Sequence, residues 1–278
     1  MLDTTTAYGL TYLFPIGDSA VGHSLRTYGE FARAEVDLID HYVSRAGPGG
    51  TFIDVGANIG AICLPVAARH RDVGEIALEA QRRIHGLLCA NSLNNRLMNV
   101  ECHHLAAGSR NGTARFPSLL LSTKGNFGDV GTEVKRDDQT LESVQMRRLD
   151  DLGTERVAFI KIDVQGAELD VLRGATELIR RDQPAMLLEV TRSKEDDTRA
   201  VSEFMLQLGY HLFVFFSPFA SPNCEKWIEA NPTLRGDFSF LALPAAEMND
   251  WSLGRFVSVE HDWPGHVREF QYLKRYGH

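Results

Sequence analysis

Short apolar runs alternate with amphipathic segments along most of this chain. Apolar runs bounded by turn residues are typical of buried strands, and apolar positions spaced three and four apart are typical of helices that bury one face. The predicted strands span residues 51–55, 74–79, 100–106, 157–163, 185–190, 210–216 and 238–243. The predicted helices span residues 28–46, 59–69, 82–93, 168–181 and 198–208.

The order of these elements predicts an α/β fold built on a doubly wound, mostly parallel sheet. Strands that alternate with helices form right-handed crossovers, which place helices on both faces of the sheet. The last two predicted strands are joined by a loop and are expected to form an antiparallel hairpin. Residues 1–27 are expected to be irregular or in short strands, and Glu35 is assigned to the polar face of the first helix.

The chain turns sharply after its first predicted strand. Residues 52–60 read Phe-Ile-Asp-Val-Gly-Ala-Asn-Ile-Gly, so the strand ends at Gly56 and a helix begins near Gly60. Gly56 permits backbone angles that other residues avoid, and Gly60 permits close approach of the helix to the strand or to a ligand. Because free N–H groups at the start of a helix bind polar ligands, this turn predicts a site for a nucleoside-like molecule.

Four acidic residues lie at or near the carboxyl ends of predicted strands. Asp54 precedes the glycine turn, and Glu79, Asp163 and Glu189 lie at the ends of later strands. A buried carboxylate is costly unless it is paired or binds something, and ligands of doubly wound sheets lie beyond these strand ends. For each acid alone, pairing with a cation such as Lys161 is the alternative; together, the four acids indicate a site.

Two details of this region narrow the ligand. Glu79 lies 23 residues after Gly56, where an acid usually accepts hydrogen bonds from a ribose diol. The middle glycine of a dinucleotide motif is missing, and Asn58 stands in its place. This favours a nucleoside without phosphates, such as S-adenosylmethionine, whose amino-acid part a polar turn can hold.

Taken together, these segments resemble the FkbM family of S-adenosylmethionine-dependent methyltransferases. The first motif is Asp-Val-Gly-Ala-Asn-Ile-Gly at residues 54–60, and the second is Ile-Lys-Ile-Asp-Val-Gln-Gly-Ala-Glu at residues 160–168. Gln165 stands where the family usually has glutamate, and Ala80 where a proline-bearing turn is common. Further family-like segments lie at residues 88–95, 99–101, 106–108, 125–128, 172–175 and 184–189.

The resemblance implies a class I methyltransferase fold, which is Rossmann-like and has a reversed last strand. It divides the chain into an N-terminal cap segment and helix (residues 1–50), an S-adenosylmethionine-binding methyltransferase domain (51–245) and a packed C-terminal tail (246–278). By similarity, the cofactor-binding residues are Asp54, Gly56, Asn58, Gly60, Glu79, Ala106, Ala107, Asn126 and Asp163. The expected acceptor-binding residues are Tyr28, Glu30 and Asn126.

The expected reaction is methyl transfer to a hydroxyl of a sugar, glycan or small natural product. Such a hydroxyl must lose its proton, and Asp163 is the first candidate for the base, followed by Glu168 and Glu189. The same three residues offer oxygens to Mg²⁺, so metal assistance is an open alternative. A nicotinamide-dependent oxidoreductase and a non-catalytic cofactor-binding protein are the two other interpretations.

Composition limits the partners of the protein. A net charge of -8 argues against an extended nucleic-acid interface, and no apolar run approaches the ~20 residues of a membrane span. The four scattered cysteines and the absence of a signal-peptide pattern predict a cytoplasmic protein with free thiols. In the loop between the last two strands, Phe219 and Trp227 are expected either to pack or to stack on a sugar face.

Overall fold

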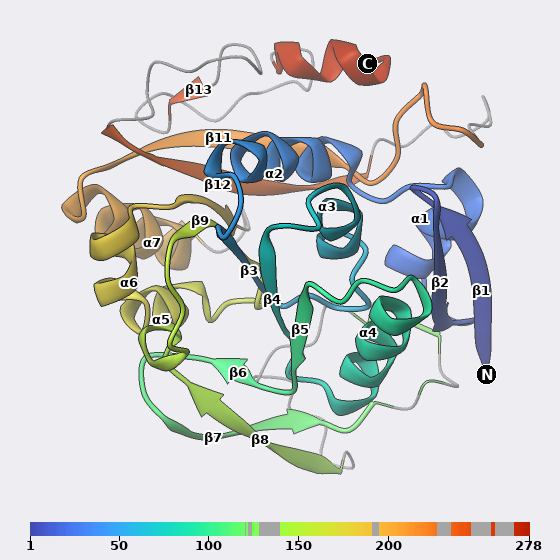
Figure 1. Ribbon diagram of the computed structural model, residues 1–278, viewed down its shortest axis with the longest axis horizontal. Helices are drawn as coiled ribbons and strands as arrows, with labels where there is room; N and C mark the ends of the chain where they lie inside the picture. Colours follow the sequence, from blue (N-terminus) through green and yellow to red (C-terminus); the bar gives the residue numbers. More distant parts are fainter. Residues whose placement is uncertain are drawn as a thin grey trace.

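A twisted sheet lies at the centre of the protein in the computed structural model, which describes residues 1–119, 121, 124–127, 140–190, 195–226, 235–245, 257–258 and 270–278. Its strands are β3 (Thr51–Val55), β4 (Gly74–Leu78), β5 (Val100–His103), β9 (Val157–Ile162), β10 (Ala185–Glu189), β11 (Tyr210–Pro218), β12 (Gly236–Pro244) and β13 (Val257–Ser258). The spatial order is β13-β11-β12-β10-β9-β3-β4-β5 (Figure 1).

The pairing pattern confirms the predicted fold class. Strands β10, β9, β3, β4 and β5 pair in parallel, whereas β12 pairs antiparallel with both β10 and β11. The reversed strand is therefore β12, as the antiparallel hairpin predicted. The chain fills the sheet outward in one direction from β3 and in the other from β9, so the boundary between these two strands is the switch point where ligands bind in such folds.

Helices cover both faces of the sheet (Figure 1). One face carries α2 (Arg33–Ala46), α3 (Cys63–Arg69) and α4 (Arg82–Asn94), and the other carries α5 (Glu168–Arg173), α6 (Thr176–Asp182) and α7 (Glu195–Gln207). Successive strand residues point to opposite faces. In β9, Phe159 belongs to the core under α2, and the next residue, Ile160, belongs to the core under α5 and α6.

An N-terminal hairpin lies beside α4. It consists of β1 (Leu2–Ala7) and β2 (Leu10–Pro15), and α1 (Val21–Tyr28) follows it. Asn91 of α4 accepts a hydrogen bond from the backbone N–H of Leu13 at 2.7 Å and donates to the carbonyls of Leu13 and Ile59. The side-chain amide of Asn91 thus links the hairpin to the turn after β3. The sequence predicted only irregular structure or short strands for residues 1–27, which contain this hairpin.

A smaller, three-stranded sheet lies in the lower part of Figure 1, and its strand order is β6-β8-β7. Its strands are β6 (Ala106–Ala107), β7 (Gly112–Pro117) and β8 (Leu141–Arg147), and η1 (Leu149–Asp151) follows. The chain ends in η4 (Gln271–Tyr276), where the Tyr272 hydroxyl donates to the carbonyl of Phe216 and accepts from its N–H, both at 2.8 Å. Trp227 and most of the predicted tail lie outside the described residues.

Four predicted helices differ from the observed ones. Helix α3 begins at Cys63 instead of residue 59, and α7 begins at Glu195 instead of residue 198. The helix predicted over 168–181 is divided into α5 and α6 at Gly174 and Ala175, and the carbonyl of Gly174 accepts from the N–H of Asp150 at 3.0 Å. The helix predicted over 28–46 begins only at Arg33, since Gly29 adopts a left-handed conformation that ends α1. The connector between α1 and α2 therefore contains Glu30 and Phe31.

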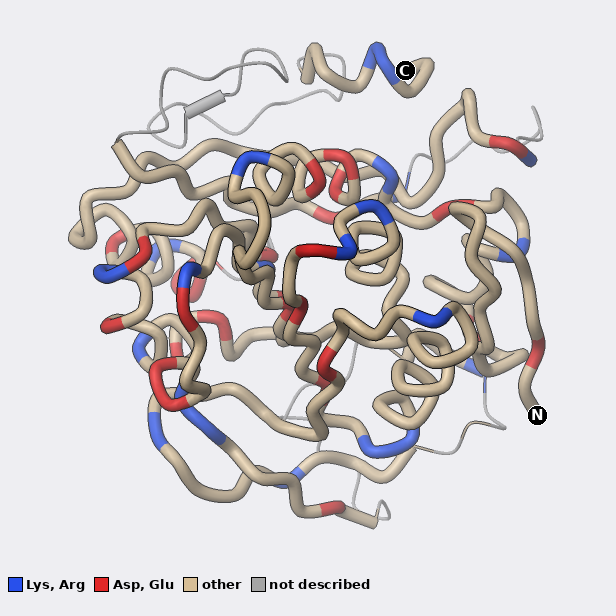
Figure 2. Tube along the Cα trace, viewed as in Figure 1, with Lys and Arg blue, Asp and Glu red and all other residues tan. Residues whose placement is uncertain are grey.

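The charged residues that the structure describes are distributed around the whole fold. Lys and Arg positions are interleaved with Asp and Glu positions along the trace (Figure 2). This distribution is consistent with the negative net charge and differs from the clustered basic face of nucleic-acid-binding domains. Within the described part of the chain, every helix is too short or too polar to cross a membrane.

Candidate active site

A cavity of about 420 Å³ lies at the carboxyl ends of the parallel strands. The position follows from the topology, because the polar turns after β3 and β9 meet at the switch point. Residues of α1, the α1–α2 connector and the small sheet complete its walls. Nine of the predicted site residues line it, namely Asp54, Gly56, Asn58, Glu79, Ala106, Ala107, Asn126, Asp163 and Glu189.

The glycine turn brings the backbone of β3 against the chain that leaves β9. Gly56 has a φ of +85°, and a Cβ there would lie 3.0 Å from the carbonyl carbon of Asp163 and closer still to its oxygen. Asn58 also has a positive φ, of 52°, and its Oδ1 accepts a hydrogen bond from the N–H of Ile59 at 2.7 Å. Asn tolerates this region because its side chain bonds locally, which explains how it replaces a glycine.

Glu79 holds the glycine turn from the end of β4. Its Oε2 accepts from the N–H of Asn58 at 3.0 Å, and its Oε1 accepts from the N–H of Gln81 at 2.7 Å. Burial raises the pKa of Glu79 to about 7, although these two hydrogen bonds oppose the increase. A carboxylate has about four lone-pair sites, so Glu79 retains capacity to bind ligand hydroxyls.

Asp54 and Lys161 lie side by side beneath the cavity floor. Lys161 is 5 % exposed, and its Nζ lies 3.8 Å from Asp54 Oδ1. Among the described residues, neither carboxylate oxygen of Asp54 accepts a hydrogen bond from a nitrogen or oxygen donor. Burial raises the pKa of Asp54, while the nearby Lys161 opposes this. Asp54 thus has Lys161 and the Cys63 thiol as partners, and its oxygens keep lone pairs that a polar group of a ligand can use.

Asp163 and Glu189 form a hydrogen-bonded carboxyl pair at the ends of β9 and β10. Gln165 Nε2 donates to both, at 3.1 Å to Asp163 Oδ1 and 2.8 Å to Glu189 Oε2. Burial, with repulsion by Asp163, raises the pKa of Glu189 to about 11. Burial also acts on Asp163, but Lys161, whose Nζ is 3.0 Å from Oδ2, and the hydrogen bonds outweigh it and hold the pKa of Asp163 below its ordinary value. At neutral pH the pair carries one proton and one negative charge.

Glu35 of α2 extends this cluster, which the sequence did not predict. It is 7 % exposed and lines a recess of about 30 Å³ together with Lys161, Asp163, Glu189 and Asp237. Burial raises the pKa of Glu35 to about 8. The assignment of Glu35 to the outer face of the helix was wrong. A signal was present, because Glu35 stands three, four and seven positions before Leu38, Ile39 and Tyr42, which form the buried stripe.

Two of the predicted residues lie outside the cavity lining because they hold the backbone. A Cβ at Gly60 would lie 2.6 Å from Leu64 Cγ, so this glycine allows the helix to pack. Glu168 Oε1 accepts from the N–H of Gly166 at 2.9 Å and from that of Val164 at 3.4 Å. Glu168 therefore organises the loop after β9.

The predicted acceptor residues Tyr28 and Glu30 are also absent from the lining of the cavity. Tyr28 packs edge-on against His23, with 6.1 Å between ring centroids. Glu30 is 4 % exposed, and its Oε1 accepts from the N–H of Ser221 at 2.7 Å. Asn126 is the one predicted acceptor residue on the cavity wall.

The predicted three-carboxylate set does not fit a Mg²⁺ ion. Glu168 is turned toward backbone N–H groups, and Asp163 and Glu189 already accept from an ammonium and an amide. In the described segments, no group of three or more His, Cys, Asp or Glu side chains is placed to hold a metal. The three carboxylates instead accept from donors of the protein, namely the backbone N–H of Gly166 and the side chains of Lys161 and Gln165.

Comparison with known proteins identifies the family. Residues 54–212, more than half of the chain, match the family described as "Methyltransferase FkbM domain". The AMB antimetabolite synthetase AmbE of Pseudomonas aeruginosa is 27% identical over 248 residues, which cover 72% of this chain and 11% of that protein. Methyltransferase sdnD of Sordaria araneosa is 29% identical over 161 residues, which cover 47% of this chain and 62% of that protein. The chain thus matches about a tenth of the first relative's length and three-fifths of the second's.

A solved structure of similar fold is the methyltransferase FkbM of Methylobacillus flagellatus KT. It has a TM-score of 0.46 and 16% identity, over 69% of this chain and 43% of that chain. The family segment begins at Asp54 and includes both motifs that carried the predicted resemblance. The family match favours the methyltransferase interpretation over the nicotinamide-dependent oxidoreductase and the non-catalytic binding protein. The chain therefore belongs to the FkbM methyltransferase family.

Proposed function

We propose that this protein transfers a methyl group to a hydroxyl of a sugar, glycan or small natural product. The observation that carries the proposal is the arrangement of Asp163 and Glu189 on the cavity wall, where Gln165 donates to both carboxyl groups and Lys161 donates to Asp163. A hydroxyl becomes an effective nucleophile as it loses its proton, so O-methylation is favoured by a carboxylate at this place.

The cavity residues fit the cofactor in three respects. Asp54 can accept the ammonium of the methionine part, because its buried oxygens lack nitrogen or oxygen donors among the described residues. Glu79 can accept the ribose hydroxyls beside its two backbone N–H bonds. The small side chains of Ala106 and Ala107 leave room for the adenine along the small sheet. When bound, S-adenosylmethionine supplies an electrophilic methyl group on a sulfonium.

The residues around Asp163 position and accept a proton. Lys161 Nζ donates to Oδ2 and Gln165 Nε2 donates to Oδ1, so Asp163 is held ionised and in one orientation. Each carboxylate oxygen has a second lone pair, and one of these takes the hydroxyl proton as the new C–O bond forms. Holding the reacting groups in line contributes a further large share of the rate. Glu168 acts indirectly, since it fixes the loop that carries Gln165.

The natural-product class of acceptor is supported by the name of one relative. AmbE is described as an antimetabolite synthetase, and 72% of this chain aligns with a small part of it. A domain of this type within such a protein fits methylation of a small biosynthetic intermediate. The glycan and sugar classes are supported by the hydrogen-bonding side chains of Asp163, Gln165 and Glu189 in the cavity lining.

The test uses Asp163→Asn, which keeps the size of the side chain but removes the base. Calorimetry with S-adenosylhomocysteine should show retained affinity, while transfer of labelled methyl to a panel of glycosides, polyols and phenols in EDTA should fall about 10²- to 10⁴-fold. Asp72→Asn, at an exposed turn residue, is the matched control. Product methylated on nitrogen or carbon, or an undiminished rate in Asp163→Asn, would refute the proposal.

A further inference from the structure

We propose that Phe31 and Phe219 form the acceptor platform of this cavity and bind the face of a polyhydroxylated, sugar-like ring. The inference rests on the proposed function, because it places the acceptor beside the same carboxyl pair. It also assigns specificity to two aromatic residues and a positioning role to three polar residues, the half-buried Tyr8 and the buried Ser24 and Glu30.

The two rings meet although 188 positions separate them in the sequence. They stack with centroids 5.1 Å apart and an angle of 25° between their planes. Both are only half-buried, and both line the large cavity. Phe31 also lines the recess that contains Asp163 and Glu189. The platform therefore borders the space next to the proton-accepting group.

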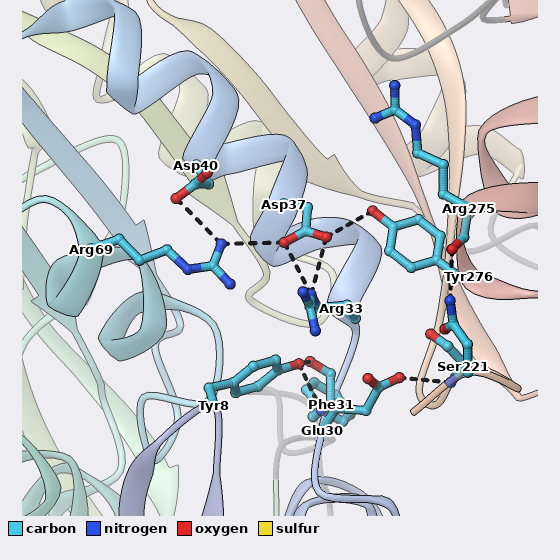
Figure 3. A network of polar contacts seen from close by, with 11 residues as sticks. Tyr8, Glu30, Phe31, Arg33, Asp37, Asp40, Arg69, Ser221, Arg275 and Tyr276 are labelled. Atoms are coloured by element: carbon cyan, nitrogen blue, oxygen red, sulfur yellow. Dashed lines mark hydrogen bonds and ion pairs between the residues drawn. The ribbon is translucent and has the colours of Figure 1, made fainter. Parts of the chain in front are cut away.

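The backbone of Phe31 is held by a buried hydroxyl. Tyr8, in the turn of the N-terminal hairpin, donates to the carbonyl of Phe31 at 2.7 Å and accepts from its N–H at 3.0 Å (Figure 3). Arg33, whose guanidinium lies 5.9 Å from the centre of the Tyr8 ring, forms an ion pair with Asp37 of the same helix. The Tyr8 hydroxyl thus holds the backbone of Phe31, and Arg33 of α2 contacts the Tyr8 ring.

The segment that carries Phe219 is tied to the α1–α2 connector by two more buried groups. Glu30 Oε1 accepts from the N–H of Ser221 at 2.7 Å, as Figure 3 shows. The Ser24 hydroxyl lies 2.8 Å from the carbonyl of Glu30 and 2.9 Å from that of Phe219, and the N–H of Ala32 donates to the carbonyl of Phe219 at 3.1 Å. These bonds cross between distant segments, so they set the distance between the two rings.

The chemistry of the recess favours a sugar over a simple phenol. An aromatic face binds the C–H face of a ring, whereas the ring's edge must present hydroxyls to the polar wall. A phenol offers one hydroxyl to this wall, whereas Asp163 and Glu189 keep more lone pairs than Lys161 and Gln165 use. A polyhydroxylated ring supplies several donors at once, so it matches both the platform and the recess.

The experiment uses the full chain saturated with S-adenosylhomocysteine and ligand-observed saturation-transfer NMR. The probes are methyl β-D-glucopyranoside and 4-methylphenol. Wild-type protein should transfer saturation to the C–H protons of the glycoside, and Phe219→Ala should reduce this transfer at least fivefold, because the stacking face is lost. Phe219→Tyr should retain it. Phe204→Ala, at a half-buried phenylalanine in the opposite core, is the matched control and should leave it unchanged.

The positioning residues give a second, independent readout. Glu30→Ala should lower saturation transfer to the glycoside as Phe219→Ala does, while leaving the calorimetric affinity for S-adenosylhomocysteine unchanged. Glu30→Gln should restore the transfer, because its amide oxygen still accepts from Ser221. Equal transfer in wild type and Phe219→Ala would overturn the platform, and binding of the phenol alone would overturn the sugar assignment. Absence of cofactor binding in wild type would instead refute the proposed function, and this inference with it.

Discussion

Gly56→Ala tests the geometry on which the whole site depends. The added Cβ would lie 3.0 Å from the carbonyl carbon of Asp163 and closer to the oxygen, in a residue whose φ is +85°. The left-handed conformation costs a residue with a Cβ about 1–2 kcal/mol, and crowding of this kind costs about 1–3 kcal/mol more. We therefore expect the free energy of unfolding to fall by roughly 2–5 kcal/mol.

The same change should separate the two strand ends that build the cavity. A displacement on the order of 1 Å at a reacting group can lower the rate about 10²-fold. We expect weaker binding of S-adenosylhomocysteine in calorimetry and a loss of methyl transfer of that size. The comparison variant is Gly153→Ala, which has a φ of +71° but no heavy atom within 4 Å of its added Cβ. Gly153→Ala therefore measures the cost of the left-handed conformation alone, without the steric overlap that Gly56→Ala adds.

A third variant, Gly86→Ala, should raise the free energy of unfolding instead of lowering it. Gly86 lies inside α4 with open space around it, so Gly86→Ala should stabilise the protein by about 0.5–1 kcal/mol. Chemical denaturation of all three variants provides the measurement. If Gly56→Ala is no less stable than Gly153→Ala and binds the cofactor like wild type, the proposed contact between the two strand ends is wrong.

Three other predictions address the acids of the site. Glu79→Gln should weaken S-adenosylhomocysteine binding roughly 10- to 100-fold in calorimetry, since hydrogen bonds to a charged group contribute about 1.5–3 kcal/mol; unchanged affinity would contradict the ribose assignment. Glu35 has a pKa raised by burial from 4.5 to about 8, so the native state loses stability as the pH rises through this range, at no more than about 1.4 kcal/mol per pH unit. Denaturation at pH 5 and 8 should show a flatter dependence for Glu35→Gln, and identical slopes would count against a buried Glu35. Gln165→Glu replaces the donor to Asp163 and Glu189 with a third carboxylate, which should raise the pKa of Asp163 and move the acid limb of the pH–rate profile to higher pH. An unmoved limb would contradict the role of Gln165 as the donor to both carboxyl groups.

The sequence by itself determined the order of the central strands along the chain, and nine of the residues that it predicted for the site line the cavity. Buried parallel strands read as continuous apolar runs, so β3, β9 and β10 were predicted within a residue or two of their observed bounds. Glycine and acidic residues at strand ends are local signals, because the carboxyl ends of parallel strands share one edge. The motif that contains Gly56 and Asn58 needed no knowledge of distant residues.

Tertiary structure decided which polar groups are buried together. Glu35 was misassigned because a charge inside an amphipathic pattern is normally solvated, and only the approach of α2 to Lys161 and Asp163 buries it. Glu30 was expected to contact the acceptor, and the structure gives its carboxylate a backbone partner across 191 positions.

Some features of the site depend on neighbouring residues in the sequence, and others depend on contacts between distant segments. Backbone angles and apolar periodicity act over a few residues, so the glycine turn and its strand are written locally. Proton sharing between Asp163 and Glu189, and the stacking of Phe31 on Phe219, depend on contacts between segments far apart in the chain. Such contacts form only once the sheet and its covering segments are packed. The sequence therefore determined the class of cofactor, and the folded structure decided where an acceptor can bind and which carboxyl can take its proton.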